Sequence, residues 1–130
     1  MRVVFDTNIF ISAFVIPGSL AYKAILKIIE GKGSLIISKE IIDEVLSVLS
    51  TKFSRDKEAI SHVAIILSEL SELVSPAKRI SVFKDDADNR ILECALYGKA
   101  DVLVTGDKEI LKLKEYKGIN IISLKEYLES

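Results

Sequence analysis

The alternation of short apolar runs with longer helical patterns is the feature that most constrains the fold of this chain. Most of the runs are continuously apolar, which is typical of strands buried on both faces of a sheet. They cover residues 3–5, 35–37, 80–83, 102–104 and 119–122. Helical patterns cover residues 20–30, 39–50, 55–73, 88–97 and 125–129, with a shorter turn of helix after Asp107. The sequence therefore predicts an α/β fold, a three-layer α/β/α sandwich with a central parallel sheet of about five strands.

The length of 130 residues suits a single domain over residues 1–130, and the 49% share of hydrophobic residues is enough to bury a core. No apolar run approaches the roughly 20 residues that a membrane-spanning helix needs. The apolar run at the N-terminus is too short for a signal peptide. We therefore expect a complete, cytoplasmic chain with no membrane partner.

The few cysteines and histidines exclude several kinds of site. Cys94 is the only cysteine and His62 the only histidine, so an internal disulfide, a cysteine zinc site and a histidine-pair mechanism are all excluded. The net charge of −1 differs from that of a strongly basic nucleic-acid binder. A nucleic acid would have to be held by local basic patches and bound metal. Five basic residues could line such a path or simply form a solvated face, namely Lys23, Lys27, Lys52, Arg55 and Lys57.

Acidic residues follow three of the five predicted strands. Asp6 comes directly after the first strand, and Asp107 follows the strand over 102–104. Asp85, Asp86 and Asp88 follow the run over 80–83. Because ligand sites in open α/β sheets lie outside the carboxyl ends of the strands, we expect these carboxylates at one edge of the sheet.

Two predicted helices place further carboxylates at the same edge. Glu44 borders the apolar arc of the helix over 39–50 and is the carboxylate of that helix best placed to lean over the edge, with Glu40 the next candidate. Asp88 shares an i, i+3, i+4, i+7 stripe with three apolar residues. A carboxylate on a buried stripe is costly unless it is hydrogen-bonded, paired or bound to metal.

Converging carboxylates repel one another, and a divalent cation resolves that repulsion. Oxygen ligands of this kind suit Mg²⁺ or Mn²⁺. Such a site activates water and stabilises charge on a phosphodiester. The residues alone thus predict a metal-assisted phosphoryl site, without specifying RNA.

Four motifs of the chain resemble, in order, those of PIN-domain nucleases. Val3-Val4-Phe5-Asp6-Thr7-Asn8 resembles the opening motif, and Glu44 falls at the position of the helix glutamate. The stretch Asp-Asp-Ala-Asp-Asn-Arg-Ile-Leu over 85–92 resembles the third motif, and Val-Leu-Val-Thr-Gly-Asp over 102–107 resembles the fourth. Each motif alone is weak, but the ordered set is specific and covers nearly the whole chain. The chain is most similar to prokaryotic PIN proteins described as the toxins of toxin–antitoxin pairs (VapC-like).

The resemblance implies a ribonuclease that uses Mg²⁺ or Mn²⁺ and hydrolyses RNA phosphodiester bonds within the chain. It further implies a homodimer, with an antitoxin protein as a possible partner. The acidic residues that it assigns to catalysis and metal binding are Asp6, Glu44, Asp88 and Asp107. It gives Asn8 and Thr105 a supporting role through hydrogen bonds.

Three neighbours of Asp88 leave alternatives open. Asp85 or Asp86 could share its role, because both stand close to it in the third motif. Arg90 is a further supporting candidate that either contacts phosphate or pairs with an acidic neighbour. Asp6, Asp88 and Asp107 also sit where helix N-caps are expected, a role compatible with metal binding.

Two other functions fit the predicted fold class. A non-catalytic RNA- or protein-binding module would be favoured by the loss of an acidic position, whereas all four are present. A phosphatase of the haloacid-dehalogenase type would need a second aspartate two residues after the first, where this chain has Asn8. A receiver domain would need an acidic pair near the first strand, which only Asp6 follows.

Overall fold

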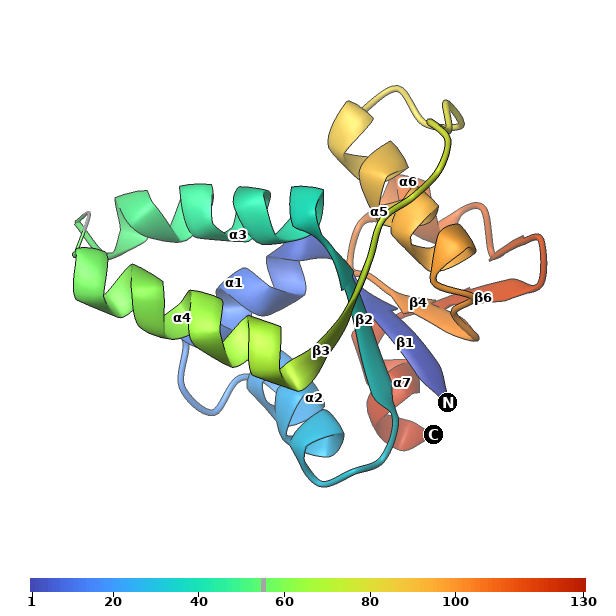
Figure 1. Ribbon diagram of the computed structural model, residues 1–130. Coiled ribbons are helices and arrows are strands. Elements are labelled where there is room, and N and C mark those ends of the chain that lie inside the picture. Colours follow the sequence, from blue (N-terminus) through green and yellow to red (C-terminus); the bar gives the residue numbers. More distant parts are fainter. Residues whose placement is uncertain (55) are drawn as a thin grey trace.

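The computed structural model describes residues 1–54 and 56–130 of the chain. Arg55, at which the sequence predicts a helix to begin and which was a candidate for an RNA path, lies outside the described residues. Within them the elements follow the order β1–α1–α2–β2–α3–α4–β3–α5–β4–α6–β5–β6–α7. The result is the α/β sandwich that the alternating pattern predicted (Figure 1).

A single mixed sheet forms the middle layer. Its strands are β1 (Arg2–Phe5), β2 (Ser34–Ser38), β3 (Ser71–Val74), β4 (Val102–Val104), β5 (Glu115–Tyr116) and β6 (Ile119–Ile122). The spatial order is β3-β2-β1-β4-β6-β5, and every neighbouring pair is parallel except β5 with β6. The expected parallel sheet of about five strands is therefore confirmed, and β5 adds a short antiparallel edge strand that the sequence did not indicate.

Helices form the two outer layers. They are α1 (Thr7–Val15), α2 (Leu20–Ile29), α3 (Lys39–Lys52), α4 (Lys57–Leu70), α5 (Asp86–Tyr97), α6 (Lys108–Leu111) and α7 (Leu124–Glu129). The chain steps outward from β1 to β3 and then returns past β1 to β4, so right-handed crossovers place α5 and α6 on the opposite face from α1 and α2. In the described part of the chain no single helix has the length and apolar character that a membrane span requires. The helices α1 and α2 together reach that length and apolar composition, but they are bent by 99° relative to each other.

The helices pack on the sheet in two different ways. Large aromatic side chains fill one face, and on the other face the backbone of α5 lies directly against the sheet. The Phe5 ring of β1 packs against Phe10 of α1 at 5.7 Å and against Tyr127 of α7 at 5.5 Å between ring centroids. On the other face, Gly98 at the end of α5 lies against Ile36, where an added Cβ would stand 2.6 Å from Ile36 Cγ2. A side chain at residue 98 would push α5 away from the sheet, and with it the acidic residues at the start of that helix.

Sequence reasoning placed the third strand wrongly. The run over 80–83 is not a strand, and β3 instead covers Ser71–Val74, which was predicted as the end of a helix. Among the residues that the structure describes, β3 pairs only with β2 at the edge of the sheet, so its short, partly exposed stretch lacks the apolar pattern of a buried strand. The acids over 85–88 therefore reach the sheet edge from the start of α5, not from the end of a strand.

Candidate active site

Asp6 is a buried carboxylate that stands where β1 gives way to α1. It is 4% exposed, and its Oδ1 accepts a hydrogen bond of 3.1 Å from the backbone N–H of Asn8, which caps α1. Its Oδ2 accepts a bond of 2.6 Å from the Thr105 hydroxyl. Burial raises the pKa of Asp6, and these hydrogen bonds lower it in part. Asp6 thus combines the predicted capping role with a place in the site.

Thr105 connects the ends of β1 and β4. The two strands are parallel neighbours, with Phe5 opposite Val104, so the next residues, Asp6 and Thr105, lie side by side. The Thr105 side chain is fully buried, and its oxygen also accepts a bond of 3.0 Å from the backbone N–H of Asp107. Asp107 in turn caps α6 by accepting from Glu109 N at 2.8 Å. One hydroxyl therefore positions two of the predicted acids.

Glu44 reaches the same place from α3. Its Oε2 accepts from the Thr7 hydroxyl at 3.5 Å, and Thr7 directly follows Asp6. Burial raises the pKa of Glu44, and the nearby charges of Asp6 and Asp85 raise it further. The alternative candidate on this helix, Glu40, is exposed and lies 3.5 Å from Arg79 Nη1 instead.

Asp88, in the first turn of α5, has the most strongly perturbed carboxyl group of the site. Its pKa is raised to about 6, first by burial and then by the charges of Asp107, Asp85, Asp6 and Glu44. Each of these acids is thus close enough to oppose ionisation of Asp88. We call these five residues the acidic cluster. Its members come from α3, from α5 and from the residues that directly precede α1, α5 and α6.

Asp85 and Asp86 are both exposed but face different groups, although the sequence left their roles open. Asp85 caps α5 by accepting from Ala87 N at 2.9 Å, and its charge raises the pKa values of Asp6, Glu44 and Asp88. The side chain of Asp86 is 85% exposed and lies 3.4 Å from Arg90 Nη1. Only Asp85 belongs to the cluster.

The two remaining supporting candidates have different surroundings. Arg90 Nη2 lies 2.7 Å from Glu93 Oε2 and donates to the Ile80 carbonyl at 3.0 Å, so its guanidinium pairs with an acidic neighbour, one of the two roles considered for it. Asn8 contributes its backbone N–H to Asp6, while its side chain is exposed. Thr7, to which sequence reasoning gave no role, is 3% exposed. Its place between Asp6 and Asn8 in the opening motif was the available signal.

A cavity of about 520 Å³ opens beside the cluster. It is lined by Val82, Phe83, Lys84, Asp85, Asp88, Asp107 and Glu109. Among the described residues no three Asp, Glu, His or Cys side chains already form a compact metal-binding group. The donor set is nevertheless the kind that suits Mg²⁺ or Mn²⁺, because its members are carboxylates that raise one another's pKa values.

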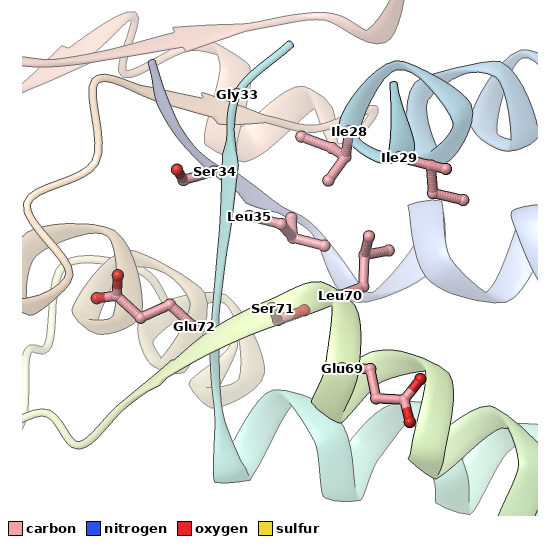
Figure 2. Close-up of a pocket in the computed structure, with 9 residues that line it drawn as sticks. All are labelled: Ile28, Ile29, Gly33, Ser34, Leu35, Glu69, Leu70, Ser71 and Glu72. Carbon is pink, nitrogen blue, oxygen red and sulfur yellow. The ribbon is translucent and has the colours of Figure 1, made fainter. Parts of the chain in front are cut away.

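A second cavity, of about 400 Å³, lies at the opposite edge of the sheet, between the end of α2 and the starts of β2 and β3 (Figure 2). It contains two carboxylates, Glu69 and Glu72. Figure 2 shows them on opposite sides of an apolar floor that includes Ile28, Leu35 and Leu70. Glu72 is paired with Arg2 at 2.7 Å. These carboxylates do not converge, so this cavity lacks the chemistry of the acidic cluster.

A family model for the PIN domain matches residues 2–109, which include the whole acidic cluster. The chain belongs to the PIN-domain family. This PIN domain is similar to an uncharacterised protein of Methanocaldococcus jannaschii, MJ1680, with 33% identity over 132 residues that cover 96% of this chain and 84% of the relative.

A solved structure supports the architecture of this PIN domain. The crystal structure of VapBC2 from Rickettsia felis, bound to a DNA fragment from their promoter, matches with a TM-score of 0.68 and 18% identity. The match covers 95% of this chain and 98% of the matched chain. A likeness at this identity shows the fold alone, and it confirms the predicted sandwich. The assignment of roles to individual acids stays a prediction.

Proposed function

We propose that this PIN domain is a Mg²⁺- or Mn²⁺-dependent endoribonuclease that hydrolyses RNA phosphodiester bonds at the acidic cluster. The observation that carries the proposal is the convergence of carboxylates from separate segments at Asp88: Asp85, Asp88 and Asp107 line one cavity, and the pKa of Asp88 is raised first by burial and then by four other carboxylates. Capping of individual helices does not require such convergence. PIN domains are in general metal-dependent nucleases, which agrees with this chemistry.

The residues that would hold the cation are Asp6, Glu44, Asp88 and Asp107, with Asp85 as a fifth neighbour. When bound, a divalent cation lowers the pKa of a water ligand and offsets negative charge on the phosphate. Thr105 and the Asn8 backbone hold the Asp6 carboxylate in one orientation at 2.6 and 3.1 Å. Buried and hydrogen-bonded, Asp6 keeps its position without needing to reorganise during the reaction.

The first experiment compares cleavage of end-labelled single-stranded RNA in Mg²⁺, Mn²⁺ or EDTA. Asp6→Asn keeps the size of the side chain but removes the charge, so we expect the rate of cleavage to fall at least 100-fold. A cooperative thermal unfolding transition of the variant would show that it still folds. Asp86→Asn is the matched control from the third motif, because its side chain is 85% exposed and outside the cluster. Metal-independent RNA binding without cleavage would instead establish the non-catalytic module.

We also propose that the protein is the toxin of a toxin–antitoxin pair and acts as a homodimer. Support comes from the fold shared with a chain of the VapBC2 complex and from exposed apolar side chains on α2, at Tyr22, Leu26 and Ile29. Their i, i+4, i+7 spacing gives one stripe that a second protein surface would cover.

Growth arrest on expression of the wild type, but not of Asp6→Asn, tests toxicity. Light scattering of the purified protein tests the dimer.

A further inference from the structure

The wall of the cavity beside the acidic cluster contains a basic residue, Lys84. The cavity is lined by the acids Asp85, Asp88, Asp107 and Glu109, and Lys84 is the one cation among its described lining residues. Lys84 is exposed and forms no ion pair with any residue that the structure describes. Its ammonium group therefore faces solvent beside a group of carboxylates without being neutralised by any one of them.

The backbone that carries Lys84 is held firmly, although it belongs to no helix or strand. Asn89, which is 2% exposed, accepts hydrogen bonds from Val82 N at 2.9 Å and from Phe83 N at 2.8 Å. Its amide donates to the Phe83 carbonyl at 2.9 Å. Three bonds from one buried side chain thus fix the two residues before Lys84. Asp85, on the other side of Lys84, is fixed as the cap of α5.

An RNA substrate meets an electrostatic problem at this site. The acidic cluster repels a polyanion, and the chain as a whole has a net charge of −1, so no global positive field attracts RNA. A cation at the wall offsets part of this repulsion at the point where the RNA backbone must approach the acids.

We infer that Lys84 contacts a backbone phosphate of the RNA next to the scissile bond, from a wall that Asn89 holds in place. This inference rests on the proposed ribonuclease function. A lysine acts on phosphate as a point charge, so the contact adds affinity without reading base sequence. Lys84 is therefore a substrate-binding residue, and Asn89 is a positioning residue.

The test measures RNA binding separately from cleavage. Binding of a fluorescent single-stranded RNA is followed by anisotropy in EDTA at several salt concentrations, in the Asp6→Asn background. Lys84→Ala should weaken binding several-fold and make the negative slope of log K against log salt shallower by about 0.7, the value for one phosphate contact on a single strand. Lys84→Arg should keep the slope. Lys78→Ala, an exposed lysine of the same connection that does not line the cavity, should leave binding unchanged.

Cleavage kinetics in Mn²⁺ provide the second readout. With Asp6 intact, Lys84→Ala should raise KM several-fold and change kcat by less than a factor of about two, because a uniform binding contact has been removed. Slope and KM equal to those of Lys78→Ala would overturn the inference while leaving the ribonuclease function intact. A wild type that neither binds nor cleaves RNA would overturn both.

Discussion

The Thr105 hydroxyl satisfies two partners with a single buried atom. It donates to Asp6 at 2.6 Å and accepts from the Asp107 backbone at 3.0 Å, so the orientation of one acid is linked to the start of the loop that carries another. The sequence indicated both acids, because each follows an apolar run at the expected sheet edge. It also gave Thr105 a supporting role, but the identity of the bonded atoms follows only from the parallel register of β1 and β4.

Replacing Thr105 tests this link at the scale of one residue. Thr105→Val keeps the shape but leaves the Asp6 carboxylate and the Asp107 N–H without their partner, which costs about 1–3 kcal/mol for a buried pair. We expect unfolding in urea to show that loss and metal-dependent cleavage to fall about 10- to 100-fold, as for other residues that orient metal ligands. Thr105→Ser retains the hydroxyl and should recover most of the activity. An equally impaired serine variant would show that packing, not the hydroxyl, matters.

At the scale of elements, the segment over 80–83 shows why an apolar pattern alone misplaced a strand. Side chains of α5 provide the hydrogen bonds that a neighbouring strand would have provided: Glu93 accepts from Ile80 N at 2.6 Å, and Asn89 accepts from Val82 N and Phe83 N. Both are buried polar residues on a helix face that also carries apolar side chains. Local sequence cannot reveal such pairing, because the partners meet only once α5 has docked.

Asn89→Ala should destabilise the whole domain by about 2 kcal/mol, since two part-buried backbone N–H groups lose the acceptor that a buried side chain provides. Chemical denaturation with urea measures this loss. Asn120→Ala is the matched control, because Asn120 is exposed on β6 and makes no side-chain bond with the residues that the structure describes; its effect should stay within about 0.5 kcal/mol. Equal losses in the two variants would contradict the role of Asn89 as the anchor of this connection.

At the scale of the whole molecule, the acidic cluster exists because the strand order places β1 between β2 and β4. Asp6, the Asp107 loop and the start of α3 thereby meet at one edge, and α5 crosses the opposite face with its N-terminus at the same edge. The alternation of strands and helices predicted this edge and four of the five acids. Asp85 could not be separated from Asp86 by sequence, because only the capping geometry at the start of α5 places the Asp85 carboxylate beside the other acids and that of Asp86 beside Arg90.

The cluster destabilises the metal-free fold at neutral pH. Asp6, Glu44 and Asp88 all have pKa values raised above those of an unfolded chain, with that of Asp88 at about 6. The folded state therefore holds protons that the unfolded state releases. The stabilisation of the fold that these bound protons provide is present below pH ~4, the ordinary carboxyl pKa, and is lost as the pH rises through about 6. A bound divalent cation removes the penalty by neutralising the charges that cause it.

We therefore expect Asp88→Asn to unfold at a higher temperature than the wild type in EDTA at pH 7.5, by about 2–5 °C for a gain near 1 kcal/mol. The gain should shrink as the pH falls below about 6 and disappear near pH ~3, where Asp88 is largely protonated in both the folded and the unfolded state. Adding Mn²⁺ at pH 7.5 should stabilise the wild type by about 2.7 kcal/mol at 100 times its Kd and the variant by much less, because one ligand is missing. Differential scanning calorimetry at the two pH values, with and without Mn²⁺, gives both comparisons. A variant less stable than the wild type in EDTA would mean that the Asp88 charge is compensated within the fold, and the cluster would then have no need of a cation.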